Sequence, residues 1–199
     1  LETYADYFER EALAYQLPVF MDRTRGLRLN PFIEYIRSAL KIVLSDFSYE
    51  TVFHYLRCGL TGFAPEEIDR LENYVLALGI KGKKKWGQPF VRRASLRREF
   101  AQEEEKEKEE LLYLEKLNAT RECFMGQIAP LLEKKKTAGE MVRTLYQFIV
   151  AGKSQEKLAG YQRYFEENNA PERAREYAQI YRLVMEVLEQ VVGLLEEEP

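Results

Sequence analysis

A basic stretch near the middle of the chain holds the residues whose types could do chemistry. Residues 80–98, IKGKKKWGQPFVRRASLRR, contain eight lysines or arginines, one tryptophan and no acid. Lysine and arginine can neutralise phosphates, and an aromatic ring can stack on an unpaired base. The stretch therefore supplies candidate nucleic-acid-binding residues, which are Lys81, Lys83, Lys84, Lys85, Trp86, Arg92 and Arg93.

Other interpretations of this stretch stay open on sequence grounds. The arginines could pair with the glutamates that follow, Glu99 and residues 103–105, or with another protein, while the lysines stay hydrated in a loop. Trp86 could stack on a DNA strand or anchor the loop on the helices. Because the formal net charge is −3, any nucleic-acid contact has to be a local patch.

No arrangement of residues predicts catalysis. GIKGKKKW lacks the spacing of a phosphate-binding loop and follows a predicted helix, so we expect no ATP site. His54 is the only histidine, and we interpret it as a partly exposed structural residue with Glu50 and Cys58 one turn away. A metal site in the Glu/Lys run at residues 99–110 is the weaker alternative to a solvated helix face, so we expect no catalytic and no metal-binding residues.

The composition indicates a globular protein. With 46% hydrophobic and 13% aromatic residues, the 199-residue chain can fill a sizeable core. Cys58 and Cys123 are too far apart for a metal motif and are expected to be reduced thiols of a cytosolic protein. No apolar run is long enough to cross a bilayer, so no membrane contact is expected. The chain starts at Leu1 without methionine and stops at Pro199, which we interpret as a piece of a longer protein.

The periodicity predicts an all-α bundle of about seven or eight helices with at most one short extended segment. Helix starts are indicated by Asn30–Pro31, Ser48, Pro65, Thr137 with Glu140, Ser154 and Pro171, and stops by Gly59 and Gly79. The pattern of residues 98–136 predicts one long helix or two in series. The last helix has an apolar seam that predicts packing along its whole length. Residues 17–20, LPVF, are expected to be extended.

The order of these motifs resembles a known family. YADYFEREALAYQLPVFMD, LNPFIEYIRSALKIV, FSYETVFHYLRCGL and EEIDRLENYVLALGIKGK follow one another from residue 4, and TAGEMVRTLYQFI and YAQIYRLVMEVLEQVV come later. This succession resembles an internal, helicase-like region of the B subunit (AddB or RexB) of AddAB-type ATP-dependent helicase–deoxyribonucleases. The resemblance covers most of the chain, although no single residue is diagnostic.

The resemblance implies a fold and a function. Residues 1–22 would be the edge of the second RecA-like lobe, a helix plus a short strand, and residues 23–199 a helical accessory domain like the 2B insertion of superfamily 1 helicases. The whole enzyme would unwind and degrade DNA in double-strand break repair and recombination, in the bacterial cytoplasm, together with its A subunit. ATP, magnesium and a 4Fe-4S cluster would bind elsewhere, because their ligands have no matching positions here. The chain itself would be a non-catalytic platform for DNA or the partner subunit; the alternative is a free-standing α-helical protein-interaction adaptor.

Overall fold

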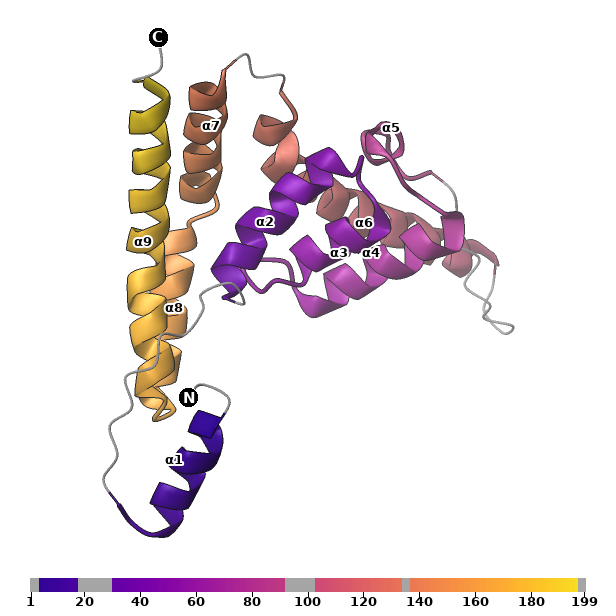
Figure 1. Ribbon diagram of the computed structural model, residues 1–199. Helices are drawn as coiled ribbons and strands as arrows, with labels where there is room; N and C mark the ends of the chain where they lie inside the picture. Colours follow the sequence, from indigo (N-terminus) through magenta and orange to yellow (C-terminus); the bar gives the residue numbers. More distant parts are fainter. Residues whose placement is uncertain (1–3, 18–29, 92–102, 134–136, 197–199) are drawn as a thin grey trace.

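The protein is all-α in the residues that the structure describes. The computed structural model describes residues 4–17, 30–91, 103–133 and 137–196 (Figure 1). These residues form nine helices and no strand, which confirms the predicted fold class. The helices are α1 (Ala5–Ala14), α2 (Pro31–Leu44), α3 (Tyr49–Leu56), α4 (Pro65–Leu78), α5 (Lys83–Trp86), α6 (Glu103–Leu132), α7 (Ala138–Ala151), α8 (Ser154–Glu167) and α9 (Pro171–Glu196).

Local side-chain chemistry sets most of the helix boundaries. The Asn30 side chain accepts the backbone N–H of Phe32 at 2.9 Å, directly before the proline that starts α2. Thr137 and Glu140 form the predicted capping box at the start of α7. Gly79 ends α4 with φ of 58°, a left-handed conformation that glycine adopts without steric cost. These predicted boundaries are confirmed.

For two segments the structure decides between interpretations that the sequence left open. The basic stretch is not all loop, because Lys83–Trp86 form the single helical turn α5. Residues 103–132 form one helix rather than two in series. On this helix Leu111 is half exposed, whereas Leu114 is buried.

Apart from α1, which lies to one side, the helices form two groups (Figure 1), and both contribute to one core. In one group α7 and α8 follow each other, and α9 runs back along both. In the other, α2 packs against α3, and α6 packs against α2 and α4. The predicted α9 seam is not buried along its whole length: Tyr177 is 8% exposed, but Val191, farther along the same seam, is 36% exposed.

The core connects the two groups through stacked aromatic rings. Tyr35 of α2 lies between Tyr55 of α3 and Phe148 of α7, with ring centroids 5.4 Å and 5.0 Å away. The Tyr55 hydroxyl donates to Gln127 of α6 at 2.9 Å, so the polar end of the stack is satisfied. A second aromatic cluster, around Trp86, is joined to this stack by Phe124, whose ring centroid lies 6.0 Å from that of Tyr55 and 5.1 Å from that of Trp86.

The proposed lobe boundary is not covered by the structure. Residues 18–29 lie outside the described residues, and they include the predicted extended segment except Leu17. The predicted division at residue 22 falls in the same range. Both stay predictions.

Candidate nucleic-acid interface

We define the lysine turn as Lys81 and residues 83–85. A glycine and a distant aspartate set its conformation. Gly82 has φ of 87°, which lets the chain reverse directly before α5. Asp46 then accepts the backbone N–H of Lys83 at 2.9 Å. Because a single helical turn is unstable alone, this capping interaction helps to fix α5 in place.

The lysines of this turn are all exposed. The Lys85 ammonium donates to the carbonyl oxygen of Gly79 at 3.1 Å, at the C-terminal end of α4 where the helix dipole is negative. Within the described part of the chain, no carboxylate forms an ion pair with the ammonium groups of Lys81, Lys83 or Lys84. The turn therefore presents an exposed positive charge that is not neutralised by those residues.

Trp86 anchors the turn and cannot stack on a base. Its ring is fully buried and lies 5.1 Å from Phe124, 6.0 Å from Phe90 and 6.5 Å from Phe47. Burying an aromatic ring of this size is worth at most about 4–6 kcal/mol, from roughly 150–250 Å² at about 25 cal/mol per Å². Stacking on a base returns only about 1–3 kcal/mol. Of the two roles expected for Trp86, the structure shows the anchoring one.

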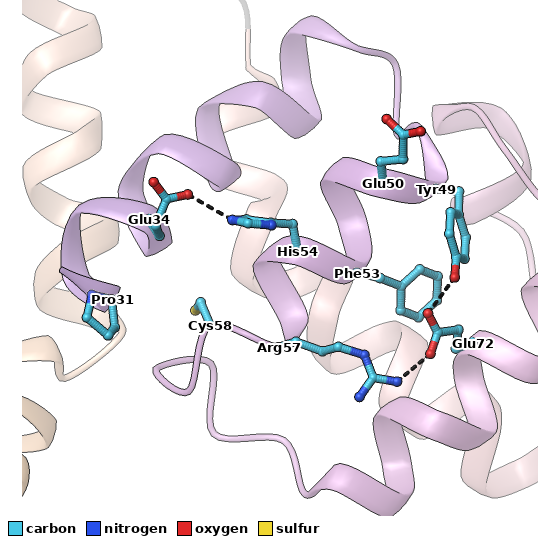
Figure 2. A pocket seen from close by; sticks show the side chains of 9 residues that line it. All are labelled: Pro31, Glu34, Tyr49, Glu50, Phe53, His54, Arg57, Cys58 and Glu72. Atoms are coloured by element: carbon cyan, nitrogen blue, oxygen red, sulfur yellow. Dashed lines mark hydrogen bonds and ion pairs between the residues drawn. The ribbon is translucent and has the colours of Figure 1, made fainter. Parts of the chain in front are cut away.

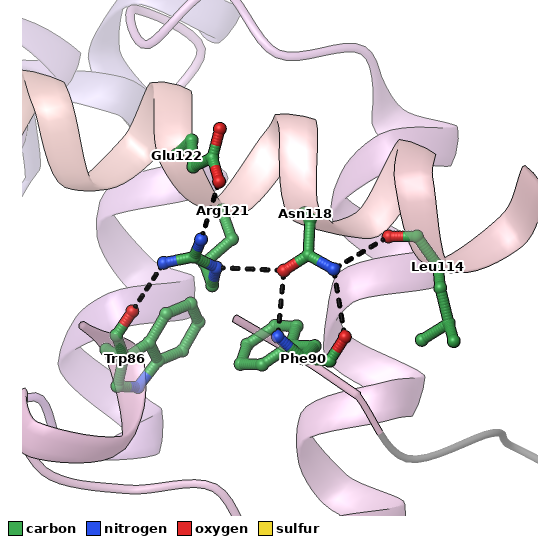
Figure 3. A network of polar contacts seen from close by, with 6 residues as sticks. All are labelled: Trp86, Phe90, Leu114, Asn118, Arg121 and Glu122. Atoms are coloured by element: carbon green, nitrogen blue, oxygen red, sulfur yellow. Dashed lines mark hydrogen bonds and ion pairs between the residues drawn. The ribbon is translucent and has the colours of Figure 1, made fainter. Parts of the chain in front are cut away.

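A polar network on α6 holds the segment that follows the lysine turn (Figure 3). The Arg121 guanidinium, 4% exposed, donates to the carbonyl oxygen of Trp86 at 3.0 Å and to Asn118 Oδ1 at 3.1 Å. Asn118 also accepts the backbone N–H of Phe90 at 2.8 Å and donates to its carbonyl oxygen at 2.9 Å. The chain from Trp86 to Phe90 is thus tied to α6 at both ends.

Sequence reasoning missed Asp46, Asn118 and Arg121. A signal existed for Arg121, because it lies at helical spacing between the buried residues Leu117 and Phe124. A lone charge on an apolar stripe predicts a buried, hydrogen-bonded group. Of the seven predicted residues, the structure brings Lys81, Lys83, Lys84, Lys85 and Trp86 together, whereas Arg92 and Arg93 lie outside the described residues.

A second polar site surrounds His54, in a cavity of about 580 Å³ (Figure 2). His54 Nε2 lies 2.8 Å from a carboxylate oxygen of Glu34, and its side chain is 60% exposed. The expected partial exposure of His54 is confirmed, but its partner is on α2 rather than one turn away. This pair links α2 to α3.

Charged partners also link α3 to α4 in this cavity. Arg57 pairs with Asp69 at 2.7 Å and with Glu72, whose other carboxylate oxygen accepts the Tyr49 hydroxyl at 2.6 Å. The Tyr49 hydrogen bond lowers the pKa of the Glu72 carboxyl, and Arg57 lowers it further. These groups are occupied with one another, so the cavity offers helix-linking pairs rather than an activated acid or base.

Among the described residues, no set of side chains matches the ligands of a metal ion or an iron–sulfur cluster. No group of three or more histidine, cysteine or acidic residues there could hold a metal ion. Cys58 is partly buried and Cys123 exposed, both as free thiols, and burial raises the pKa of Cys58. The chain's two cysteines cannot supply the four thiolates of a 4Fe-4S cluster. Most of the Glu/Lys run at residues 99–110 lies where side chains are not described.

The structure thus defines an all-α domain that presents an anchored basic turn. No family model matches the chain. It is 36% identical over its whole length to part of the B subunit of the ATP-dependent helicase/deoxyribonuclease of Lachnoclostridium phytofermentans. It is 38% and 37% identical, over 92% and 96% of its length, to the B subunits of the same name from Caldanaerobacter subterraneus and Clostridium botulinum strain Loch Maree.

These matches confirm the resemblance to the B subunit of this class of enzyme, and the chain is homologous to an internal segment of it. The chain spans only 16–17% of the length of these three relatives. None of the helices in the part of the chain that the structure describes has the length and apolar character needed to span a bilayer.

Proposed function

We propose that the chain is a non-catalytic helical accessory region in the B subunit of an ATP-dependent helicase/deoxyribonuclease, and that its lysine turn contacts DNA. The observation that carries the proposal is the exposed lysine turn held on a fully buried Trp86. The relatives are named as enzymes that act on DNA, which makes phosphate the natural counter-charge. Lysine on a preorganised turn neutralises phosphate without ordering a loop first.

The contact we propose is with the phosphate backbone alone. Trp86 and Phe90 are buried, so neither ring is available for a base. Phosphate contacts carry no sequence information, and binding should therefore not depend on sequence. Arg92 and Arg93 stay candidates for the same surface.

We also propose a wider role for the chain, which the similarity to these B subunits supports. We place the region in a heterodimer with an A subunit, in double-strand break repair and recombination in the bacterial cytoplasm. Residues 1–22 would belong to a RecA-like lobe and residues 23–199 to a 2B-like accessory domain. ATP, magnesium and a 4Fe-4S cluster would bind to other parts of that enzyme.

The test replaces Lys83, Lys84 and Lys85 by glutamine, in the chain and in the complete heterodimer. Affinity for duplex, forked and single-stranded DNA is measured between 50 and 200 mM salt. Each lost phosphate contact should reduce the slope of log affinity against log salt by about 0.7 to 0.9, so three contacts account for about a 40-fold change over this range on duplex DNA. An unchanged affinity with an unchanged slope would refute the DNA contact.

A matched control removes the same charge elsewhere. Arg163 on α8 and Arg175 and Arg182 on α9 are exposed, and their replacement by glutamine should leave the slope unchanged. An equal loss of slope in this control would mean that overall charge, rather than the lysine turn, governs binding.

A second candidate role, as a platform for the partner subunit, is favoured by an apolar groove. The groove has a volume of about 360 Å³, and Arg37 is the one charged residue that lines it. Replacing the 55%-exposed Val187 by glutamate should weaken co-purification with the A subunit, whereas the exposed Gln179→Glu on the same helix should not. The apolar lining of this groove comes from α2 and α9 and includes Ile33, Ile36, Leu40, Val184, Val187 and Leu188.

A further inference from the structure

The Arg121 guanidinium is a buried cation whose hydrogen bonds are spent on the basic segment. It donates to Asn118 and to the carbonyl oxygen of Trp86, the last residue of α5. Its Cζ atom also lies over the Phe90 ring, 5.7 Å from the ring centroid. Its carboxylate partner, Glu122 at 2.9 Å, is 68% exposed. A buried charge is costly unless it is hydrogen-bonded, so these bonds fix the position of the Trp86 backbone.

Asn118 fixes the other end of the segment. Its amide accepts from the Phe90 N–H and donates to the Phe90 carbonyl, which is a two-point clamp on one residue. It also donates to the Leu114 carbonyl at 3.0 Å, which holds the amide in this orientation on α6. The clamp and the Arg121 bond together leave the segment between Trp86 and Phe90 little freedom (Figure 3).

We propose that Arg121 and Asn118 are positioning residues for the lysine turn. The inference rests on the proposed DNA contact and adds that affinity depends on the turn being held before DNA arrives. A four-residue helix does not persist without tertiary support. Without these two side chains the lysines would still be present, but they would have to be ordered on binding.

This mechanism has a signature that differs from loss of the lysines. In Arg121→Met the lysine charges remain, so the salt slope should stay that of the wild type while affinity falls by about 10-fold. In Asn118→Leu, too, the salt slope should stay that of the wild type while affinity falls by about 10-fold. Removing the lysines, in contrast, lowers the slope itself.

The experiment measures structure and binding on the same variants, in the full chain and in the heterodimer. Trp86 is the only tryptophan, so its fluorescence reports on the anchor directly. Arg121→Met should shift Trp86 emission and speed amide exchange at Trp86 and Gly87, and Asn118→Leu should speed exchange of the Phe90 amide. Circular dichroism confirms that each variant is folded, and the second variant replaces the first if that one is not.

Two further variants act as controls. Arg121→Lys keeps a donor for the Trp86 carbonyl and should restore part of the affinity. Glu122→Gln removes the exposed partner alone and should change neither affinity nor exchange.

The outcomes separate this inference from the proposed function. Where the glutamine variants of the lysines do weaken DNA binding, unchanged exchange at residues 86–90, or faster exchange with unchanged DNA affinity, would overturn the positioning role. If the glutamine variants of the lysines leave DNA binding unchanged, the DNA contact fails. Faster exchange in Arg121→Met would then still show that Arg121 holds the turn.

Discussion

Replacing Gly152 by alanine should destabilise the protein because of one hydroxyl group. Gly152 follows α7 with φ of −69° and ψ of −3°, a conformation that alanine adopts readily. A Cβ atom there would lie 2.5 Å from the Tyr35 hydroxyl oxygen, too close for any real contact, and 3.5 Å from Tyr35 Cζ, an ordinary distance. The Cβ atom would also lie 3.3 Å from the Phe148 carbonyl oxygen, a tight contact that needs only a small shift, so the severe conflict is with the Tyr35 hydroxyl.

The magnitude follows from how firmly Tyr35 is held. Its ring is 2% exposed and is stacked on Tyr55 and Phe148, so it cannot move aside without disturbing the core. Overpacking of this kind costs about 1–3 kcal/mol. In a Tyr35→Phe background the clashing atom is gone, and Gly152→Ala should be neutral or stabilise by about 0.4–1 kcal/mol through the unfolded state.

A double-mutant cycle by urea denaturation measures the coupling between the two sites. We expect an interaction energy of about 2 kcal/mol, and about 4–8 °C between the melting temperatures of the Gly152→Ala variants with and without Tyr35. Tyr35→Phe alone supplies the fourth corner of the cycle. Additive effects of the two substitutions would refute the reasoning.

Two further predictions concern pH. Burial raises the pKa of Tyr35 to about 12, so above about pH 10 the unfolded state loses this proton while the folded state keeps it. Stability should fall by about 1.4 kcal/mol per pH unit for this tyrosine between about pH 10 and 12, and Tyr35→Phe should make the measured fall shallower. The second prediction concerns acid pH. The Tyr49 hydrogen bond and Arg57 lower the pKa of Glu72, so the contribution of Glu72 to stability is present above its unfolded-state pKa and is lost as pH falls through its folded-state pKa. The stability difference between wild type and Glu72→Gln should stay constant near neutral pH and shrink below about pH 4; a difference independent of pH would contradict the assignment.

Short-range chemistry made the helix boundaries predictable. Asn30 before a proline, the Thr137 and Glu140 pair and Gly79 each act on backbone groups within a few residues. Such interactions depend on the sequence spacing alone, so a pattern is enough to place them. The fold class was predictable for the same reason, because helical periodicity also depends on spacing along the sequence.

Burial was harder to predict from the pattern. The stripe of α9 was regular to its end, yet Val191 on this stripe is exposed, because a seam is buried only where another helix covers it. For Trp86 the error had the opposite direction, because one of its two expected roles required an exposed ring and the ring is buried. Its basic neighbours suggested a ring available to DNA, and only the aromatic surroundings contributed by other helices buried it.

The sequence by itself determined that this protein is helical, where most of its helices start, and that its positive charge gathers at residues 80–98, since each of these follows from residue type and spacing. The tertiary structure decided which of those charges lie on an ordered surface. Asp46 caps α5 from 37 residues away, Arg121 holds the end of α5 from 35 residues away, and Asn118 holds Phe90 from 28 residues away. Contacts at such separations exist only after the chain has folded, because they depend on how α6 packs against the preceding helices and not on any local preference.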